Sequence, residues 1–198
     1  FDHPEFDDPN IEKENFYALP VFSGDFTDDV GHGTAVASMA VGKNLGIAGR
    51  CKLISVKIGG VIDGVGRTAS LLELGMAIDA IVARAAADPT KTRLVNMSFT
   101  THRSAWLDAK VQGLIDLGIT VVVAAGNQGI DVEELSPAGL DTVITVGSID
   151  KYDIPSGFNN ISPGDSGLTT STGLSLDIFA PGEDIVVATT SEIGRAHV

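Results

Sequence analysis

Apolar runs recur along the chain at long intervals, and several are nearly continuous in Val, Ile and Leu. Such runs are typical of strands that are buried on both faces of a parallel sheet. The predicted strands are residues 53–58, 93–99, 119–125, 142–149 and 176–180.

Segments with helical patterning lie between these runs. Residues 69–88 carry a wide apolar stripe that stops where Asp88 precedes a proline. Residues 104–118 begin at a capping-type serine and end at a glycine, and residues 33–43 form a third helix rich in small residues. The alternation predicts an α/β fold with three layers, in which a mostly parallel sheet carries helices on both faces and the crossovers are right-handed.

Two stretches are predicted to be loops. The first 30 residues and residues 150–175 are rich in Asp, Asn, Gly, Ser and Pro, and residues 159–175 read as an added surface loop. We find no repeat, low-complexity tract or charged linker, so the sequence predicts one domain.

Composition excludes several classes of function. The 198 residues are 43% apolar and 20% charged, as in globular proteins. Thirteen basic and 26 acidic residues give a net charge of −13, which argues against a nucleic-acid partner because phosphates would be repelled. Cys51 is the single cysteine, so neither an internal disulfide nor a cysteine metal site is expected. No apolar run reaches about 18 residues, so no membrane span is expected.

His32 has the sequence context of a general base. It stands between two glycines in residues 28–41, "DDVGHGTAVASMAV", where glycine permits close backbone approach and small residues let a helix pack tightly. A general base needs such a rigid mount, with one imidazole nitrogen aimed at a nucleophile and the other held by a carboxylate. For the other three histidines we favour a surface or structural role.

Asn127 is a second candidate. It follows a predicted buried strand in residues 121–129, "VVVAAGNQG". Catalytic groups gather beyond the carboxyl ends of parallel strands, and an amide there is placed to donate to an oxyanion. A plain Asn-Gln-Gly turn is the alternative interpretation.

These motifs resemble those of the subtilisin-like serine proteases, the subtilases. The stretch "GHGTAVAS" is similar to the family's histidine motif, and "VVVAAGN" to the strand that bears its oxyanion-hole asparagine. The resemblance extends in order through "HPEF" (3–6), "LVNMS" (94–98), "SPAGLDTVITVGSID" (136–150) and "LDIFAPG" (176–182).

The resemblance implies a secreted serine endopeptidase that cleaves polypeptides through a Ser-His-Asp triad. It makes His32 the general base and acid, and Asn127 the donor to the oxyanion. An extended peptide would lie between two strand edges. The implied substrate-binding residues are Gly64, Gly66, Ser98, Phe99, Thr100, Ala125 and Gly126. We expect a monomer.

The family's flanking motifs are absent. No D-[ST]-G precedes His32, and Ser191 lacks the neighbours of the family's G-T-S-x-A-x-P. We therefore expect residues 1–191 to be a partial subtilase catalytic domain, truncated at both ends and nearly inactive alone. Residues 192–198 are expected to be a non-native tail, because "EIGRAHV" matches the translation of a sequencing adapter.

Departures inside the matched region leave two properties open. The family has glycines where Thr100 and Thr101 stand, and a β-branched residue there would narrow the primary specificity pocket. The loop 42–49 is shorter than the family's calcium-binding version, and Asn44 alone is a poor ligand set. We predict no cofactor or metal site, while calcium elsewhere stays open.

Two other classes of function are alternatives to the protease. A non-catalytic, protease-like module that binds extended peptides is the main alternative. A nucleotide-binding domain would rest on "GVG" (64–66), which is a weak match to a phosphate loop because a third glycine is missing.

Overall fold

The computed structural model describes residues 3–62, 64–158, 168–190 and 193–196. Contacts divide the chain into two compact units. The first comprises Phe1–Ala77 with Asp184–Ala196, and the second comprises Ile78–Glu183.

A parallel pair of strands organises the first unit. Strand β1 (Lys13–Ala18) pairs with β2 (Leu53–Lys57), with an irregularity between Asn15 and Tyr17. The prediction that the first 30 residues are a loop is therefore wrong at β1. The sequence of this strand, "KENFYA", is largely polar, and its pairing with a distant segment overrides its weak local preference for a strand.

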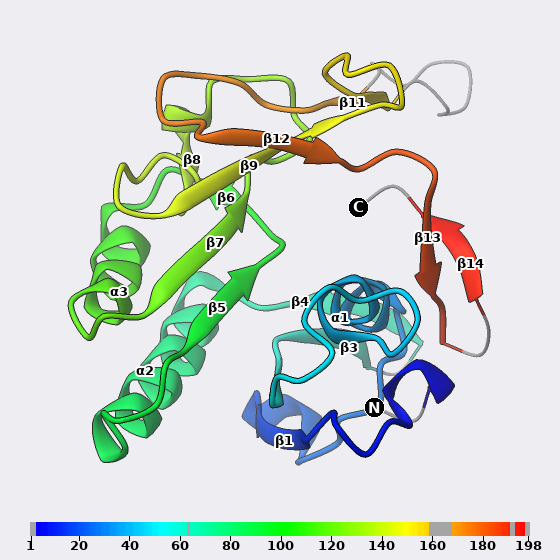
Figure 1. Ribbon diagram of the computed structural model, residues 1–198. Coiled ribbons are helices and arrows are strands. Elements are labelled where there is room, and N and C mark those ends of the chain that lie inside the picture. The colour runs from blue at the N-terminus through cyan, green and yellow to red at the C-terminus, as the bar shows by residue number, and fades with distance from the viewer. Residues whose placement is uncertain (1–2, 63, 159–167, 191–192, 197–198) are drawn as a thin grey trace. The chain divides into compact units, whose positions relative to one another are not determined.

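Helix α1 (His32–Val41) packs through its small residues. Ala35, Ser38 and Val41 are buried, and the Ala188 N–H donates to Ser38 Oγ at 3.0 Å. Ala188 ends β13 (Ile185–Ala188), which pairs antiparallel with β14 (Ile193–Ala196) (Figure 1). Four residues of the predicted non-native tail thus form β14, whereas Ser191 lies outside the described residues.

The rest of the first unit is a hairpin and two short turns. Strands β3 (Gly59–Ile62) and β4 (Val65–Thr68) pair antiparallel. The turns are the 3-10 helices η1 (Pro4–Phe6) and η2 (Pro20–Phe22). A small core of Phe6, Ile11 and Val41 anchors η1 against α1.

A parallel sheet organises the second unit. Its spatial order is β12-β9-β7-β5 (Figure 1). The strands are β5 (Leu94–Met97), β7 (Thr120–Ala124), β9 (Ile144–Ile149) and β12 (Ile178–Pro181). Together with β2, they confirm the predicted strands with small shifts in their ends. The nearly continuous apolar runs do correspond to parallel strands.

The predicted helices are confirmed as well. Helix α2 (Leu71–Ala87) runs from the first unit into the second, and α3 (Ala105–Ile115) packs against β7. Ser104 caps α3 as predicted, since its side chain accepts from the Leu107 N–H. Lys110 and Asp79 join α3 to α2 at 2.7 Å. The predicted α/β class is therefore confirmed.

Short elements connect the sheet to its loops. Strand β6 (Thr101–His102) pairs antiparallel with β8 (Leu135–Ser136), which follows the 3-10 turn η3 (Val132–Glu134). Strand β10 (Gly157–Phe158) pairs with β11 (Leu168–Thr169), so the loop predicted for 150–175 contains a small ladder. Residues 159–167 of the predicted added loop lie outside the described part of the chain. No helix among the described residues is both long and apolar enough to cross a membrane.

Candidate active site

His32 is the first residue of α1, and its side chain is exposed. The backbone enters the helix through Gly31, whose φ of 86° lies in the left-handed region that favours glycine. The glycine before the histidine is therefore explained by the geometry of the turn. This turn presents the imidazole at the start of a helix.

Asp28 caps this helix and was not identified from the sequence. Its Oδ1 accepts from the Gly31 N–H at 2.8 Å, and its Oδ2 accepts from both the N–H and the hydroxyl of Thr34 at 2.7 Å. The carboxylate satisfies N–H groups that a helix leaves free at its start. Asp28 is therefore a positioning residue for His32.

The ionisation of Asp28 follows from these contacts. Burial alone would raise the pKa of the carboxyl group. The hydrogen bonds from Thr34 and Gly31 outweigh it and hold the pKa of Asp28 below its ordinary value of 3.8. The cap is thus charged near neutral pH, as the positive end of the helix dipole favours.

Lys57 tethers the loop that leads to Asp28. Its Nζ donates to the Thr27 carbonyl at 2.5 Å, lies 3.4 Å from Asp29 Oδ2, and sits 4.7 Å from the ring centre of Phe22. The lysine side chain is only 7% exposed, so it needs these partners to offset desolvation. The residues flanking Asp28 are thereby fixed to the end of β2.

Glu5 joins the "HPEF" segment to the loop after α1. It is 2% exposed and accepts from Asn44 Nδ2 at 2.7 Å, from the Asn44 N–H at 3.0 Å and from the Leu45 N–H at 3.2 Å. Asn44, weighed above as a calcium ligand, thus donates its amide to Glu5. In the described ranges, no group of three or more His, Cys, Asp or Glu residues could hold a metal ion.

The predicted residues Gly64 and Gly66 lie on the β3–β4 hairpin of the first unit. Gly64 has φ +77° at the turn, and Gly66 pairs with Val61 within β4. Both glycines are exposed, and a Cβ built on either would meet open space. The hairpin therefore presents an accessible strand.

The remaining predicted residues meet at one edge of the sheet in the second unit. Strands β5 and β7 are parallel neighbours with Met97 opposite Val123, so both end at the same edge. The residues that follow them there are Ser98, Phe99, Thr100, Ala125, Gly126 and Asn127. The structure thus brings together six residues that the resemblance assigned to substrate and oxyanion.

Backbone hydrogen bonds fix the turn before Asn127. The Ala125 N–H donates to the Val146 carbonyl at 2.8 Å, and the Ser171 N–H donates to the Gly126 carbonyl at 2.9 Å. Gly126 has φ +91°, so glycine is favoured there too. The Asn127 side chain is exposed beyond this fixed turn.

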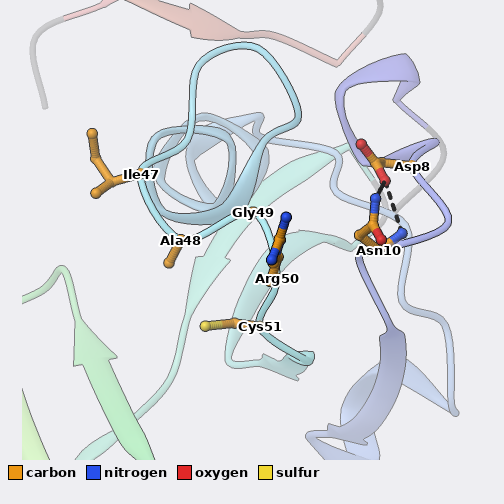
Figure 2. A pocket seen from close by; sticks show the side chains of 7 residues that line it. All are labelled: Asp8, Asn10, Ile47, Ala48, Gly49, Arg50 and Cys51. Atoms are coloured by element: carbon orange, nitrogen blue, oxygen red, sulfur yellow. Dashed lines mark hydrogen bonds between the residues drawn. The ribbon is translucent and has the colours of Figure 1, made fainter.

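Two surface pockets lie in the first unit. One, of about 470 Å³, is lined by Asp8, Asn10, Ile47, Ala48, Gly49, Arg50 and Cys51, with Asn10 hydrogen-bonded to Asp8 (Figure 2). It contains none of the predicted site residues. The other, of about 340 Å³, is polar and includes Asp28 and Thr34, so it borders the cap of α1.

Comparisons with known proteins agree with the motifs. Residues 10–197 match the Subtilase family. The chain is 35% identical to Subtilisin-like protease 3 of Pseudogymnoascus destructans, in an alignment that covers 90% of this chain and 42% of that protein. It is 34% identical to Alkaline protease 1 of Aspergillus clavatus over 94% of its length and 41% of that protein. The chain thus spans about two fifths of these relatives.

A solved structure supports the same relationship. The match to the crystal structure of a cold adapted subtilisin-like serine proteinase covers 99% of this chain and 64% of the proteinase chain. The two are 27% identical in sequence, and the TM-score is 0.81. The likeness holds across both the sequence and the fold, and the chain belongs to the subtilase family.

Proposed function

We propose that the protein containing this chain is a serine endopeptidase in which His32 is the general base and Asn127 stabilises the oxyanion. In this proposal, segments outside these 198 residues supply the nucleophilic serine and the aspartate of the triad. The observation that carries it is the mount of His32. An exposed imidazole stands at the start of a helix whose first turn is clamped by Asp28.

The mechanism assigns one step to each residue. His32 accepts the proton of the serine hydroxyl as the oxygen attacks the peptide carbonyl, and it then gives that proton to the leaving amine. The amide of Asn127 donates to the carbonyl oxygen as negative charge develops on it. The backbone turn at Gly126, held by hydrogen bonds from both sides, supports this role because it presents the exposed Asn127 side chain at a defined place.

Two segments support binding of an extended peptide, and the first is exposed while the second is half-buried. In the first unit, the β3–β4 hairpin presents Gly64 at its turn and Gly66 in β4 without an obstructing Cβ. In the second unit, Ser98, Phe99 and Thr100 continue beyond the end of β5. Each offers backbone groups to which a peptide could add as a strand.

Kinetics of the full-length protein test the proposal. We expect His32→Ala to lower kcat by about 10⁴-fold or more, because the triad acts as a unit. Asn127→Ala should lower kcat by about 10²–10³-fold, the range known for removing one such donor in subtilisin. His102→Ala, at an exposed histidine on β6, is the matched control and should keep the wild-type rate.

Binding without cleavage would overturn the proposal. If the full-length protein binds unstructured peptides but hydrolyses none, it is the non-catalytic peptide-binding module.

We also propose that the protein is secreted and monomeric. Proteolytic activity in the culture medium and light scattering of the purified protein test these two points.

A further inference from the structure

We propose that Thr100 and Gln128 restrict the peptide side chain bound at the carboxyl ends of β5 and β7 to a small one, that of glycine, alanine or serine. This inference rests on the proposed function and names its substrate class. It stands on contacts within the second unit alone.

The two side chains meet across the ends of neighbouring strands. Thr100 follows β5 and Gln128 follows β7, which are paired in parallel. The Gln128 amide Nε2 donates to Thr100 Oγ1 at 3.4 Å. Ligands of parallel sheets bind in the crevice beyond these carboxyl ends, so the contact spans the place where a substrate side chain would enter.

Gly126 lies next to both side chains of this contact. A Cβ built on it would be 2.5 Å from Gln128 Oε1, 3.0 Å from Thr100 Oγ1 and 3.0 Å from Leu135 Cδ1. These separations are shorter than ordinary van der Waals contacts, so a methyl group beside the Gly126 Cα would require Gln128 to move and Thr100 and Leu135 to give way. The space that a glycine would offer to a substrate is already occupied.

Thr100 is the fixed member of the pair. The next residue, Thr101, pairs with Ser136, and the Ser104 N–H donates to Ser136 Oγ at 2.8 Å. Leu135 is 1% exposed, so the opposite wall is part of the core. A β-branched side chain on a held backbone has few rotamers with which to withdraw.

Gln128 is the movable member, because its side chain is long and exposed. A large substrate side chain must displace it and break its bond to Thr100 without replacing that bond. A small side chain leaves the pair intact. Thr100 therefore sets the width of the site, and Gln128 adds a smaller penalty for bulk.

The test uses the full-length protein and two peptides that differ only in the residue before the scissile bond, alanine or phenylalanine. We expect kcat/KM for the alanine peptide to exceed that for the phenylalanine peptide by about 10-fold or more. Thr100→Gly should raise the phenylalanine-to-alanine ratio of kcat/KM by about 10-fold, the size of effect that pocket contacts produce. Gln128→Ala should raise it less. The ratio does not depend on how much of a variant folds.

The chain offers a matched control pair. Thr142 Oγ1 donates to Gln112 Oε1 at 2.8 Å, which is the same pair of residue types at an exposed place elsewhere in the second unit. Thr142→Gly and Gln112→Ala should leave the ratio at its wild-type value.

The outcomes separate this inference from the proposed function. Wild-type preference for phenylalanine, or an unchanged ratio in both Thr100→Gly and Gln128→Ala, overturns the inference and leaves the protease intact. Failure to hydrolyse any peptide overturns the proposed function, and this inference with it.

Discussion

Asp28 Oδ2 accepts two hydrogen bonds from Thr34, one from its backbone N–H and one from its hydroxyl, each at 2.7 Å. Asp28 Oδ1 meanwhile accepts from the N–H of Gly31 at 2.8 Å. His32 lies between these two anchor points in the sequence. Its backbone is therefore held from both sides before any substrate binds, which is the kind of preorganisation that a general base requires.

Removing this cap should destabilise the protein. We expect Asp28→Ala to lower the free energy of unfolding by about 1 kcal/mol, since N–H groups at the helix start lose their acceptor. Thr34→Val, which removes only the hydroxyl donor, should cost less. Urea denaturation followed by circular dichroism measures both, and an Asp28→Ala variant as stable as wild type would contradict the capping role.

The contribution of the Asp28 charge should depend on pH in one direction. Because the pKa of Asp28 is lowered in the folded state, its ionised form stabilises the fold above the ordinary value of 3.8. That stability is lost as pH falls from 3.8 through the lower folded-state pKa. The stability difference between wild type and Asp28→Asn should be constant near neutral pH and shrink in this acidic window. A difference that instead grows on acidification would contradict the assignment.

Glu5→Ala should lower the free energy of unfolding more than the loss of an exposed acidic side chain does. The substitution leaves the two N–H groups of Asn44 and Leu45, and the Asn44 amide, without their acceptor. Such losses cost about 1–3 kcal/mol. Glu12→Ala is the matched control because Glu12 is exposed. Equal unfolding midpoints in urea for the two variants would show that Glu5 is not the link to the loop 42–49.

Glu73 should titrate at unusually low pH. The Ser70 N–H, the Arg67 guanidinium and the Ser70 hydroxyl all donate to its carboxylate, and they lower the pKa of Glu73 to about 2. NMR titration of the Glu73 carboxyl carbon measures this value. Arg67→Met should move the midpoint upward, and a wild-type midpoint near 4.5 would exclude the arrangement.

Arg103 should be needed to neutralise Asp108. Arg103 Nε lies 3.1 Å from Asp108 Oδ2, whose side chain is only 8% exposed, and Arg103 Nη1 also donates to the Gly139 carbonyl at 2.8 Å. Arg103→Met strands a buried carboxylate and should cost about 1–3 kcal/mol, less than for a fully buried pair because the Arg103 side chain is 44% exposed. The double variant Arg103→Met with Asp108→Leu should recover part of that loss in urea denaturation. No recovery would indicate that Asp108 is not the group left unpaired.

Most of the sheet could be predicted from sequence because its strands are apolar runs, although the expectation that both faces are buried is wrong for β5 and β12, whose residues are mostly exposed or half-buried. Residues 119–125 and 142–149 are nearly unbroken apolar runs, and both are strands within two residues of the predicted bounds. Strand β1 could not be found in this way. Its charged residues Lys13 and Glu14 mask the pattern, and its partner β2 lies far along the chain.

Only those residues of the candidate site that lie in sequence motifs could be predicted. His32 and Asn127 stand in recognisable contexts, whereas Asp28, Glu5 and Lys57 act through bonds to backbone groups that leave no periodic signal. The contact of Thr100 with Gln128 depends on the register of β5 and β7. Such pairings become visible only once the chain is folded.

Labelling with a fluorophosphonate most directly tests the central claim that His32 activates a serine nucleophile. The full-length wild-type protein should be labelled at one serine, and His32→Ala should slow the reaction by about 10³-fold or more because the serine loses its base. His102→Ala should label at the wild-type rate. Equal labelling of wild type and His32→Ala, or no labelling of the wild-type protein, would contradict the account.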